Sequence, residues 1–317
     1  MNSRRKFIKT TTAGVAGITL GSHVSASVKS AKERLRPIHI FTKCLQFLDY
    51  DEMAKVVAKQ GFDGADLTVR TGGQVLPENV ESDLPKAVKA LREAGVDSHM
   101  IVTKIINADD PLSERIIKTM ADLGIKYYRM GYLDYEDKKP FHKNLEELKT
   151  NFEKLEKLNR KYGVHGDYQN HSGLRVGGPV WDLYYLLKER DPEYIGVQYD
   201  VRHAMVEGGV SWPLGMKLLA PWIKTTDIKD FIWYKNRNGE WRLKNVPLGE
   251  GMVDFDTYFA LYKSLNIKAP VSIHYEYDLG GAEHGKRNPA MDLAEIYSWL
   301  NRDITFLKKY YKQFDLT

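Results

Sequence analysis

The chain has 317 residues, of which 43% are hydrophobic and 28% are charged, and its formal net charge is +5. This is the composition of an ordinary globular protein, and the length suits one large hydrophobic core or two modest ones. A single cysteine, Cys44, excludes an internal disulfide. Because Cys44 lies in an apolar stretch, we expect a buried and unreactive thiol.

The start of the chain has the pattern of a signal peptide. Arg4, Arg5 and Lys9 precede or border a short segment of small and apolar residues, and no acidic residue interrupts it. The paired arginines resemble the twin-arginine export motif of bacteria. We therefore expect residues 1–26 to be cleaved, residues 27–36 to form a disordered or extended lead-in, and the mature protein to be periplasmic. A short disordered basic tail is the alternative.

Removal of this segment changes what the net charge implies. It carries four basic residues and no acidic one, so the formal charge falls from +5 to +1. Binding to a phosphate backbone needs a clear excess of Lys and Arg on one face, so we expect no nucleic acid partner. No later segment offers a run of about eighteen apolar residues, the usual minimum for a spanning helix, so we expect no stable membrane insertion after cleavage.

Beyond residue 36 the sequence alternates between short β-rich runs and longer stretches with helical periodicity. The β-rich runs cover residues 38–45, 63–69, 96–102, 125–133, 164–171, 195–200, 223–230 and 271–278. The helical stretches cover residues 49–62, 83–95, 113–124, 144–163, 180–191, 212–220, 256–266 and 290–314. Eight such units predict parallel strands with right-handed crossovers, closed into a single (βα)8 TIM barrel over residues 37–317.

Residues 231–253 interrupt this regularity, because they are too many for an ordinary connection between a strand and a helix. The segment "NRNG" at 236–239 is flanked by aromatic and alternating residues, which predicts the tip of a β-hairpin. Long connections after barrel strands usually belong to the active face.

Four of the predicted strands end in polar side chains. These are Gln169 in "YQNHSG", Asp200 in "YDVRH", Asp227 in "DIKD" and Glu276 in "YEYD". Parallel barrel strands all end at the same rim, where catalytic residues collect, so we expect the four side chains to converge. For any one of them alone, a helix N-cap or a loop salt bridge is the alternative.

These motifs resemble those of the sugar phosphate isomerase and epimerase family, the xylose isomerase-like TIM barrels. The similarity runs from "FTKCLQFLDYDEMAKVVAKQGFDGADL" through "YQNHSG", "YDVRH", "DIKD", "PLGEGMVDF" and "YEYD", in that order. In sugar-acting members, Glu, Asp, His and Glu at the ends of the fifth to eighth strands typically hold one divalent metal. The corresponding residues here are Gln169, Asp200, Asp227 and Glu276, so two of the four match.

The resemblance therefore implies a divalent metal held by these four residues, and no nucleotide cofactor. Because all four donors would be oxygen atoms, Mg, Mn or Ca is favoured over Zn. The alternative is that the metal has been lost and that Lys229 and Arg202 pair with the carboxylates, since carboxylates gathered without a cation repel one another.

The glutamine also bears on the mechanism that the resemblance implies. Family epimerases use two opposed carboxylates, one to remove a proton next to a carbonyl and one to return it, and Gln169 cannot accept a proton. Glu276 is left as the general base, raised in pKa if it is partly desolvated, with His203 or His171 as a partner and Lys229 as a further catalytic residue. This favours one-base isomerisation, or elimination of a group β to a carbonyl, over two-base epimerisation.

Export would place the protein among non-phosphorylated sugars and their derivatives, because sugar phosphates are largely intracellular. We expect Lys43, Asn170, His171 and Trp233 to contact such a small-molecule carbohydrate, since aromatic faces stack on sugar rings. The implied function is a carbohydrate isomerase or epimerase acting by metal-assisted proton abstraction. A lyase acting on 3-keto-glycosides and a non-catalytic saccharide-binding barrel are the alternatives, and an oligomer is compatible with the sequence.

Overall fold

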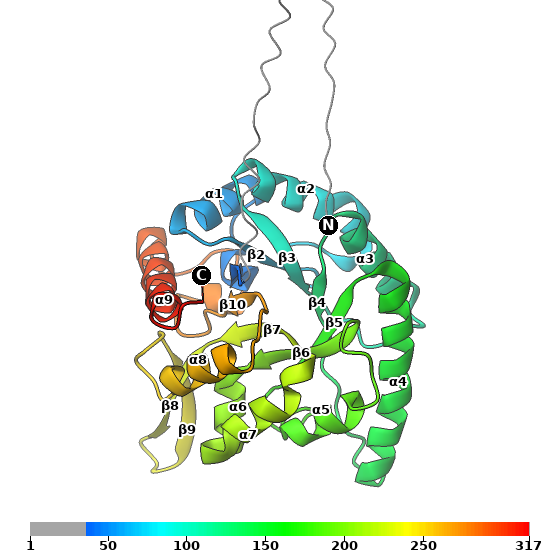
Figure 1. The fold of residues 1–317 in the computed structure, drawn as a ribbon. Coiled ribbons are helices and arrows are strands. Elements are labelled where there is room, and N and C mark those ends of the chain that lie inside the picture. Colours follow the sequence, from blue (N-terminus) through cyan, green and yellow to red (C-terminus); the bar gives the residue numbers. More distant parts are fainter. Residues whose placement is uncertain (1–35, 317) are drawn as a thin grey trace, which may run out of the picture. The chain divides into compact units, whose positions relative to one another are not determined.

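The computed structural model describes residues 36–316, so the predicted signal peptide lies outside the described residues. Within this range, eight parallel strands close a barrel in the order β1-β10-β7-β6-β5-β4-β3-β2, and helices surround it (Figure 1). The predicted TIM barrel is therefore confirmed.

The elements follow one another as the alternation of the sequence predicts. The barrel strands are β1 (Ile38–Phe41), β2 (Gly64–Thr68), β3 (Asp97–Val102), β4 (Tyr127–Arg129), β5 (His165–Gln169), β6 (Ile195–Asp200), β7 (Ile223–Ile228) and β10 (Val271–Ile273). The α-helices are α1 (Tyr50–Gln60), α2 (Val80–Glu93), α3 (Pro111–Asp122), α4 (Phe141–Tyr162), α5 (Val180–Leu187), α6 (Val201–Gly208), α7 (Trp212–Leu219), α8 (Phe255–Ser264) and α9 (Leu293–Gln313). Short 3-10 helices are η1 (Thr42–Leu45), η2 (Pro77–Asn79), η3 (Gly209–Ser211), η4 (Ala220–Trp222) and η5 (Ala282–His284).

Aspartate side chains begin several of the helices. Asp49, Asp110, Asp254 and Asp292 each accept a hydrogen bond from a backbone N–H in the first turn of α1, α3, α8 and α9. Asp200 does the same for α6. The sequence analysis did not predict α6, because its eight residues follow β6 without a turn signal or a long periodic stretch.

The eighth barrel strand is shorter than predicted, since β10 ends at Ile273 and Glu276 lies three residues beyond it. The chain leaves the strand ladder there because two tyrosines turn outward to bond α9. Tyr275 donates to the backbone oxygen of Leu300 at 2.8 Å, and Tyr277 donates to Asp303 at 2.9 Å. Glu276 lies between the two tyrosines and is thereby held at the barrel rim.

The register of the strands brings polar side chains to the same height. Asp227 of β7 is aligned with Asp200 of β6 on one side and with Ser272 of β10 on the other. Gln169 of β5 is aligned with Gln198 of β6. Parallel strands in this register place their carboxyl ends together, so the polar groups meet across the barrel mouth.

The long connection after β7 contains the predicted hairpin, formed by β8 (Asp230–Lys235) and β9 (Trp241–Val246), which lies outside the barrel (Figure 1). Asp230 fastens its base. The carboxylate of Asp230 accepts hydrogen bonds from the backbone N–H groups of Gly249, Gly251 and Val253 at 2.9, 2.9 and 3.0 Å. A Cβ atom at Gly251 would lie 2.1 Å from Asp230 Oδ1, so this position requires glycine. The "PLGEGMVDF" motif therefore contributes to loop anchoring.

Two smaller predictions concern the described residues. Cys44 is buried, as predicted, and burial raises the pKa of its thiol to about 12, so it remains protonated at neutral pH. None of the helices between residues 36 and 316 combines the length and the apolar character that crossing a bilayer requires.

Candidate active site

The carboxylate of Glu276 lies between two lysines at the barrel mouth. Lys43 Nζ is 3.2 Å from Oε1, and Lys229 Nζ is 3.3 Å from Oε2. The Glu276 side chain is 24% exposed, so a ligand can reach it. Burial acts to raise its pKa, but the two ammonium groups outweigh burial and hold the pKa of Glu276 well below its usual range. The prediction of a raised pKa was wrong, because it did not include both cations.

Lys229 is the centre of the polar cluster and is only 2% exposed. Its Nζ atom lies 2.9 Å from Asp200 Oδ2 and 2.9 Å from His203 Nε2, in addition to its contact with Glu276. Burial acts to lower the pKa of Lys229, but Asp200 and Glu276 outweigh burial and raise it. Lys229 is therefore a charged ammonium group that joins three of the predicted site residues.

His203 lies on α6 between two cations. Its Nε2 atom faces Lys229, while its Nδ1 atom lies 2.8 Å from Arg202 Nη1 and 2.8 Å from Ser172 Oγ. Burial, followed by the charge of Lys229, lowers the pKa of His203 well below its ordinary value, so the ring is neutral. A neutral imidazole accepts at only one nitrogen, so the proton on the ring decides which cation it binds.

Asn170 and His171 follow β5 and lie beside this cluster. The Asn170 amide donates to the backbone oxygen of Asp200 at 3.0 Å and accepts from its backbone N–H at 2.8 Å, so it joins β5 to β6. Both ends of that buried amide are therefore engaged within the protein. The His171 ring packs on the His203 ring with centroids 3.9 Å apart, and burial followed by Lys229 lowers the pKa of His171 to about 4.

Gln169 presents its amide hydrogens to the aspartates. Its Nε2 donates to Asp200 Oδ2 at 2.8 Å and to Asp227 Oδ2 at 2.6 Å. Its Oε1 accepts from Arg129 Nη1 at 3.0 Å and from the hydroxyl of Tyr132. A guanidinium group can only donate, so the oxygen of Gln169 must face Arg129 and its nitrogen must face the two carboxylates.

Asp227 completes the convergence of the four predicted strand-end residues. Besides Gln169, it accepts a hydrogen bond from Gln198 Nε2 at 2.7 Å, and His274 Nε2 lies 3.0 Å from its Oδ1. Burial and the neighbouring charge of Asp200 raise the pKa of Asp227 well above its usual range. The structure therefore brings Gln169, Asp200 and Asp227 together in one hydrogen-bonded group, and Lys229 connects that group to Glu276.

In this arrangement the four predicted ligands do not fit a divalent ion. The ammonium group of Lys229 lies against Asp200 and Glu276, and the N–H groups of Gln169 point at Asp200 and Asp227. An ion bound by all four would have to displace Lys229 and turn the oxygen of Gln169 away from Arg129.

A different group in the barrel interior could hold a metal. Ligand atoms of Asp66, Asp227 and His274 lie within 4.8 Å of one another, and all three residues are buried. This group shares one residue, Asp227, with the predicted set. Two carboxylates and an imidazole are suitable donors for several divalent ions, so the donor set does not select one of them.

Several residues of the site were missed by the sequence analysis. Arg129 ends β4 and bonds Gln169, so the rule that selected the other strand ends also applies to it. His274 lies two positions before Glu276, and the alternation of side chains along a strand could have revealed it. Asn245 of β9 accepts from Arg202 at 2.8 Å and donates to the backbone oxygen of Glu276 at 3.3 Å. No sequence signal points to Asn245, because its position depends on how the hairpin folds over the mouth.

Trp233 lies outside the cluster around Lys229. Its side chain is 41% exposed on the hairpin, where it lines an open hollow with Trp241 and Met252. Phe231 of β8 is paired with Asn245 of β9, so their side chains lie on the same face of the hairpin. Side chains alternate between the two faces along a strand, so Trp233, two residues after Phe231, lies on that face as well. The hollow therefore continues the face of the hairpin that bonds Arg202 and Glu276.

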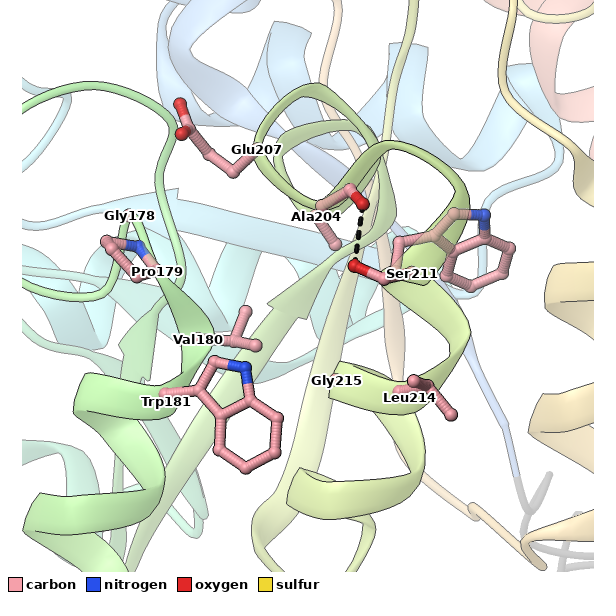
Figure 2. Close-up of a pocket in the computed structure, with 11 residues that line it drawn as sticks. Gly178, Pro179, Val180, Trp181, Ala204, Glu207, Ser211, Leu214 and Gly215 are labelled. Carbon is pink, nitrogen blue, oxygen red and sulfur yellow. Dashed lines mark hydrogen bonds between the residues drawn. The ribbon is translucent and has the colours of Figure 1, made fainter.

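Another hollow lies between α5 and α7, with Trp181 on one side and Leu214 on the other (Figure 2). Glu207 contributes a carboxylate, but its Oε1 already accepts from the backbone N–H of Gly173 at 2.8 Å. None of the predicted site residues lines this hollow, so it is separate from the cluster around Lys229.

Residues 54–302 match the model of the family described as xylose isomerase-like TIM barrel, and the chain belongs to this family. The fold is similar to that of a 3-keto-D-glucoside 4-epimerase from E. coli, with a TM-score of 0.63 and 12% identity over 86% of this chain and 99% of the other. A D-allulose 3-epimerase from Methylomonas sp. in complex with D-allulose gives a TM-score of 0.64 and 15% identity over 87% and 97% of the two chains.

A D-psicose 3-epimerase from Clostridium cellulolyticum H10 with D-tagatose gives a TM-score of 0.65 and 12% identity over 86% and 99% of the two chains. At such identities the likeness establishes a shared fold alone. No curated protein matches the sequence.

Proposed function

We propose that this protein is a carbohydrate isomerase or epimerase-like enzyme that removes a proton next to the carbonyl of a non-phosphorylated sugar derivative. The observation that supports this most directly is the partly exposed Glu276 carboxylate between Lys43 and Lys229. An ionised carboxylate accepts a proton from carbon, and adjacent ammonium groups stabilise the negative charge that then develops on the carbonyl oxygen.

The two lysines have a second effect on Glu276. In the free protein they lower its pKa, which makes it a weak base. When the carbonyl oxygen of a substrate takes hydrogen bonds from the same ammonium groups, they contact Glu276 less closely and its basicity rises. Substrate binding would thus activate the base at the moment when it is needed.

The side chains at the barrel mouth account for each part of the proton transfer. Glu276 takes the proton, the C–H bonding pair forms a new C=C bond, and the carbonyl π pair moves to oxygen as an enolate beside Lys229 or Lys43. We propose that Lys229, and not a metal ion, stabilises the enolate, because Asp200 is already bonded to Lys229 and to Gln169. Protonation of the same carbon on the opposite face gives an epimer. In a 2-hydroxy carbonyl compound, transfer of the hydroxyl proton to the enolate oxygen and return of the abstracted proton to the former carbonyl carbon gives an isomer.

A lyase acting on 3-keto-glycosides is a second candidate, and the presence of Gln169 in place of a carboxylate favours it. The amide of Gln169 cannot take up and return a proton, and its oxygen is already bonded by Arg129 and Tyr132, so this position provides no second base. Elimination needs no return of the proton to carbon, because the enolate collapses with loss of the group β to the carbonyl.

The hairpin and the N-terminal segment supply the remaining parts of the proposal. Trp233 and Trp241 would stack on a sugar ring that extends out of the mouth. Residues 1–26 would export the protein through the twin-arginine route to the periplasm, where non-phosphorylated sugars and glycosides are available.

The proposal is tested by hydrogen exchange in deuterated water. The protein is incubated with glucose, 3-keto-glucose, D-allulose and a 3-keto-glucoside, and deuterium at carbon is followed by NMR. Exchange or elimination with at least one substrate, lost in Glu276→Gln, is the expected result. Tight binding of a sugar without exchange at any carbon would instead identify a non-catalytic saccharide-binding barrel.

A further inference from the structure

A pocket of about 280 Å³ beside Gln169 is lined by three basic side chains, Arg70, Lys104 and Arg129. Tyr132 also lines it, and both Arg129 and Tyr132 donate hydrogen bonds to the oxygen of Gln169. The pocket therefore adjoins the strand-end cluster on the side of β2 to β4. None of its basic residues was among the predicted site residues.

Arg129 is held rigidly in the wall of this pocket. It is 6% exposed, and its guanidinium lies 5.6 Å from the centre of the Phe41 ring and 5.3 Å from that of Tyr132. Its Nη1 bonds Gln169, but its buried Nε has no hydrogen-bond partner. A buried guanidinium with an unsatisfied donor is costly unless something else supplies an acceptor.

Arg70 follows β2 and brings a second guanidinium close to the first. Its charge lies 5.4 Å from the centre of the same Phe41 ring, and Lys43 lies 5.5 Å from it. Burial, together with the charge of Arg129, lowers the pKa of Arg70 to about 10, so both arginines stay charged at neutral pH. Several like charges thus gather around one aromatic ring.

Carboxylates of the protein compensate these charges only from a distance, because Asp66 and Glu276 act electrostatically on both arginines without contacting them. Within residues 36–316, no carboxylate lies within 4.0 Å of a charged nitrogen of Arg70, Lys104 or Arg129. The other cations at the mouth differ in this respect, because Lys43 and Lys229 are paired with Glu276 and Asp200. The pocket is therefore a site of unpaired positive charge next to the proposed base.

We infer that this pocket binds an anionic group of the substrate, a carboxylate or a phosphate, so that the enzyme acts on an acidic sugar derivative. The inference rests on the proposed function for the location of the reacting carbon near Glu276. Guanidinium groups match the planar, paired oxygens of a carboxylate and bind phosphate equally well. Both arginines share the Phe41 ring with Lys43, and Lys43 contacts Glu276 at 3.2 Å, so an anion held by the arginines would lie close to the base.

An acidic group on the substrate would also assist the chemistry. It would neutralise the excess positive charge around Phe41 and leave Lys43 and Lys229 to stabilise the enolate. It would fix the sugar by one end, which holds the reacting C–H bond in place at Glu276. A carboxylate agrees with the non-phosphorylated substrate proposed above, and a phosphate would offer the same chemistry.

The test is calorimetric binding of three sugars with the same ring, namely glucose, glucuronate and glucose 6-phosphate. We expect at least one of the acidic sugars to bind ten times more tightly than glucose. Arg70→Gln and, separately, Lys104→Gln should each bring the ratio of the two affinities several-fold closer to one. Arg92→Gln, an exposed arginine of α2, is the matched control and should leave the ratio unchanged. Glucuronate and glucose 6-phosphate together identify which anion is preferred.

Equal affinities for all three sugars, or an unchanged ratio in both Arg70→Gln and Lys104→Gln, would overturn the inference. Melting curves of both variants identify a folding defect, and the exposed Lys104 keeps the test valid if Arg70→Gln does not fold. The affinities are measured in the natural protein and also in Glu276→Gln, in which the sugars should bind without being turned over. A lack of hydrogen exchange with every sugar would therefore refute the proposed function while the anion preference is still measured.

Discussion

Lys229 Nζ lies 2.9 Å from Asp200 Oδ2, and both side chains are buried at the mouth of the barrel. Asp200 at the same time caps α6 through the backbone N–H of His203 and accepts a hydrogen bond from Gln169. The Asp200 carboxylate therefore caps a helix, accepts a hydrogen bond from the end of a neighbouring strand and pairs with a buried cation. The helix cap that the sequence offered for Asp200 is present in the fold, and the same carboxylate lies in the polar cluster at the strand ends.

Removal of the positive charge at Lys229 should destabilise the protein. Lys229→Met leaves Asp200 and Glu276 without their shared cation, and we expect a loss of about 3–5 kcal/mol in the free energy of unfolding. The double variant Lys229→Met with Asp200→Asn should recover part of that loss, since it leaves no buried charge unpaired at this position. Urea denaturation of the three proteins measures both effects. Equal stability of Lys229→Met and the natural protein would contradict the pairing.

The Glu276→Gln substitution separates a catalytic from a structural role. It keeps the shape of the side chain but removes the proton acceptor, so turnover should fall by roughly a hundredfold or more while the fold persists. Asp278→Asn, an exposed carboxylate two positions further on, is the matched control and should leave turnover nearly intact. If Glu276 only ties the end of β10 to neighbouring loops, the melting temperature falls instead and activity per folded molecule is unchanged.

Metal binding should depend on Lys229. With the ammonium group in place, we expect Asp200→Asn to leave the affinity for Mn²⁺ unchanged, because Asp200 is engaged by Lys229 and Gln169. Lys229→Met frees two carboxylates, Asp200 and Glu276, and should gain a Mn²⁺ site, visible by electron paramagnetic resonance and lost on further substitution of Asp200. Any Mn²⁺ bound by the natural protein should instead be lost in Asp66→Asn, which removes one residue of the interior group. Loss of Mn²⁺ in Asp200→Asn alone would show that the four predicted ligands do assemble around an ion.

The raised pKa of Asp303 should be visible in how the stability of the protein depends on pH. Burial raises the pKa of Asp303 to about 7 in the folded protein, above the value of about 3.9 in an unfolded chain. The folded state therefore binds more protons between these values, and this residue makes stability fall as the pH rises from about 4 to about 7. Asp303→Asn stays neutral and should gain stability relative to the natural protein between pH 5 and pH 8 in urea denaturation. A constant difference across that range would contradict a raised pKa.

The aromatic hollow of the hairpin can be tested against the second hollow of the molecule. Trp233→Ala should weaken binding of a disaccharide substrate several-fold, because stacking on the ring is lost. Trp181→Ala removes an exposed tryptophan of the same kind from the hollow between α5 and α7 and is the matched control. If both substitutions change the calorimetric affinity equally, the hairpin is not part of the substrate site.

The barrel could be predicted because its signals are local. The alternation of strands and helices, and the turn sequence "NRNG", are each contained in a few neighbouring residues, and the barrel and hairpin both follow from them. Convergence of Gln169, Asp200 and Asp227 followed from a general property of parallel strands. The barrel, the hairpin and the convergence of the strand ends all depend on the position of the backbone, which the pattern of the sequence largely determines.

Side-chain orientation could not be predicted, because it depends on partners far away in the chain. Arg129 decides which end of the Gln169 amide faces the aspartates, and the two residues are 40 positions apart. Lys43 and Glu276 are 233 positions apart, yet their contact helps to reverse the expected shift in the pKa of Glu276. Desolvation alone gave the wrong sign for the pKa shift of Glu276, since the cations that oppose it, Lys43 of η1 and Lys229 after β7, come from distant parts of the chain.

Asp230 has a consequence for how this barrel can acquire new specificities. Its carboxylate holds the chain at Gly249, Gly251 and Val253, on the far side of the excursion that begins next to Lys229. The two ends of the excursion are therefore fastened to each other at the base of the hairpin, where Asp230 is also paired with Val246. The outer part of the hairpin, residues 234–242, can therefore change in length and sequence while Phe231, Asn245 and Lys229 keep their positions.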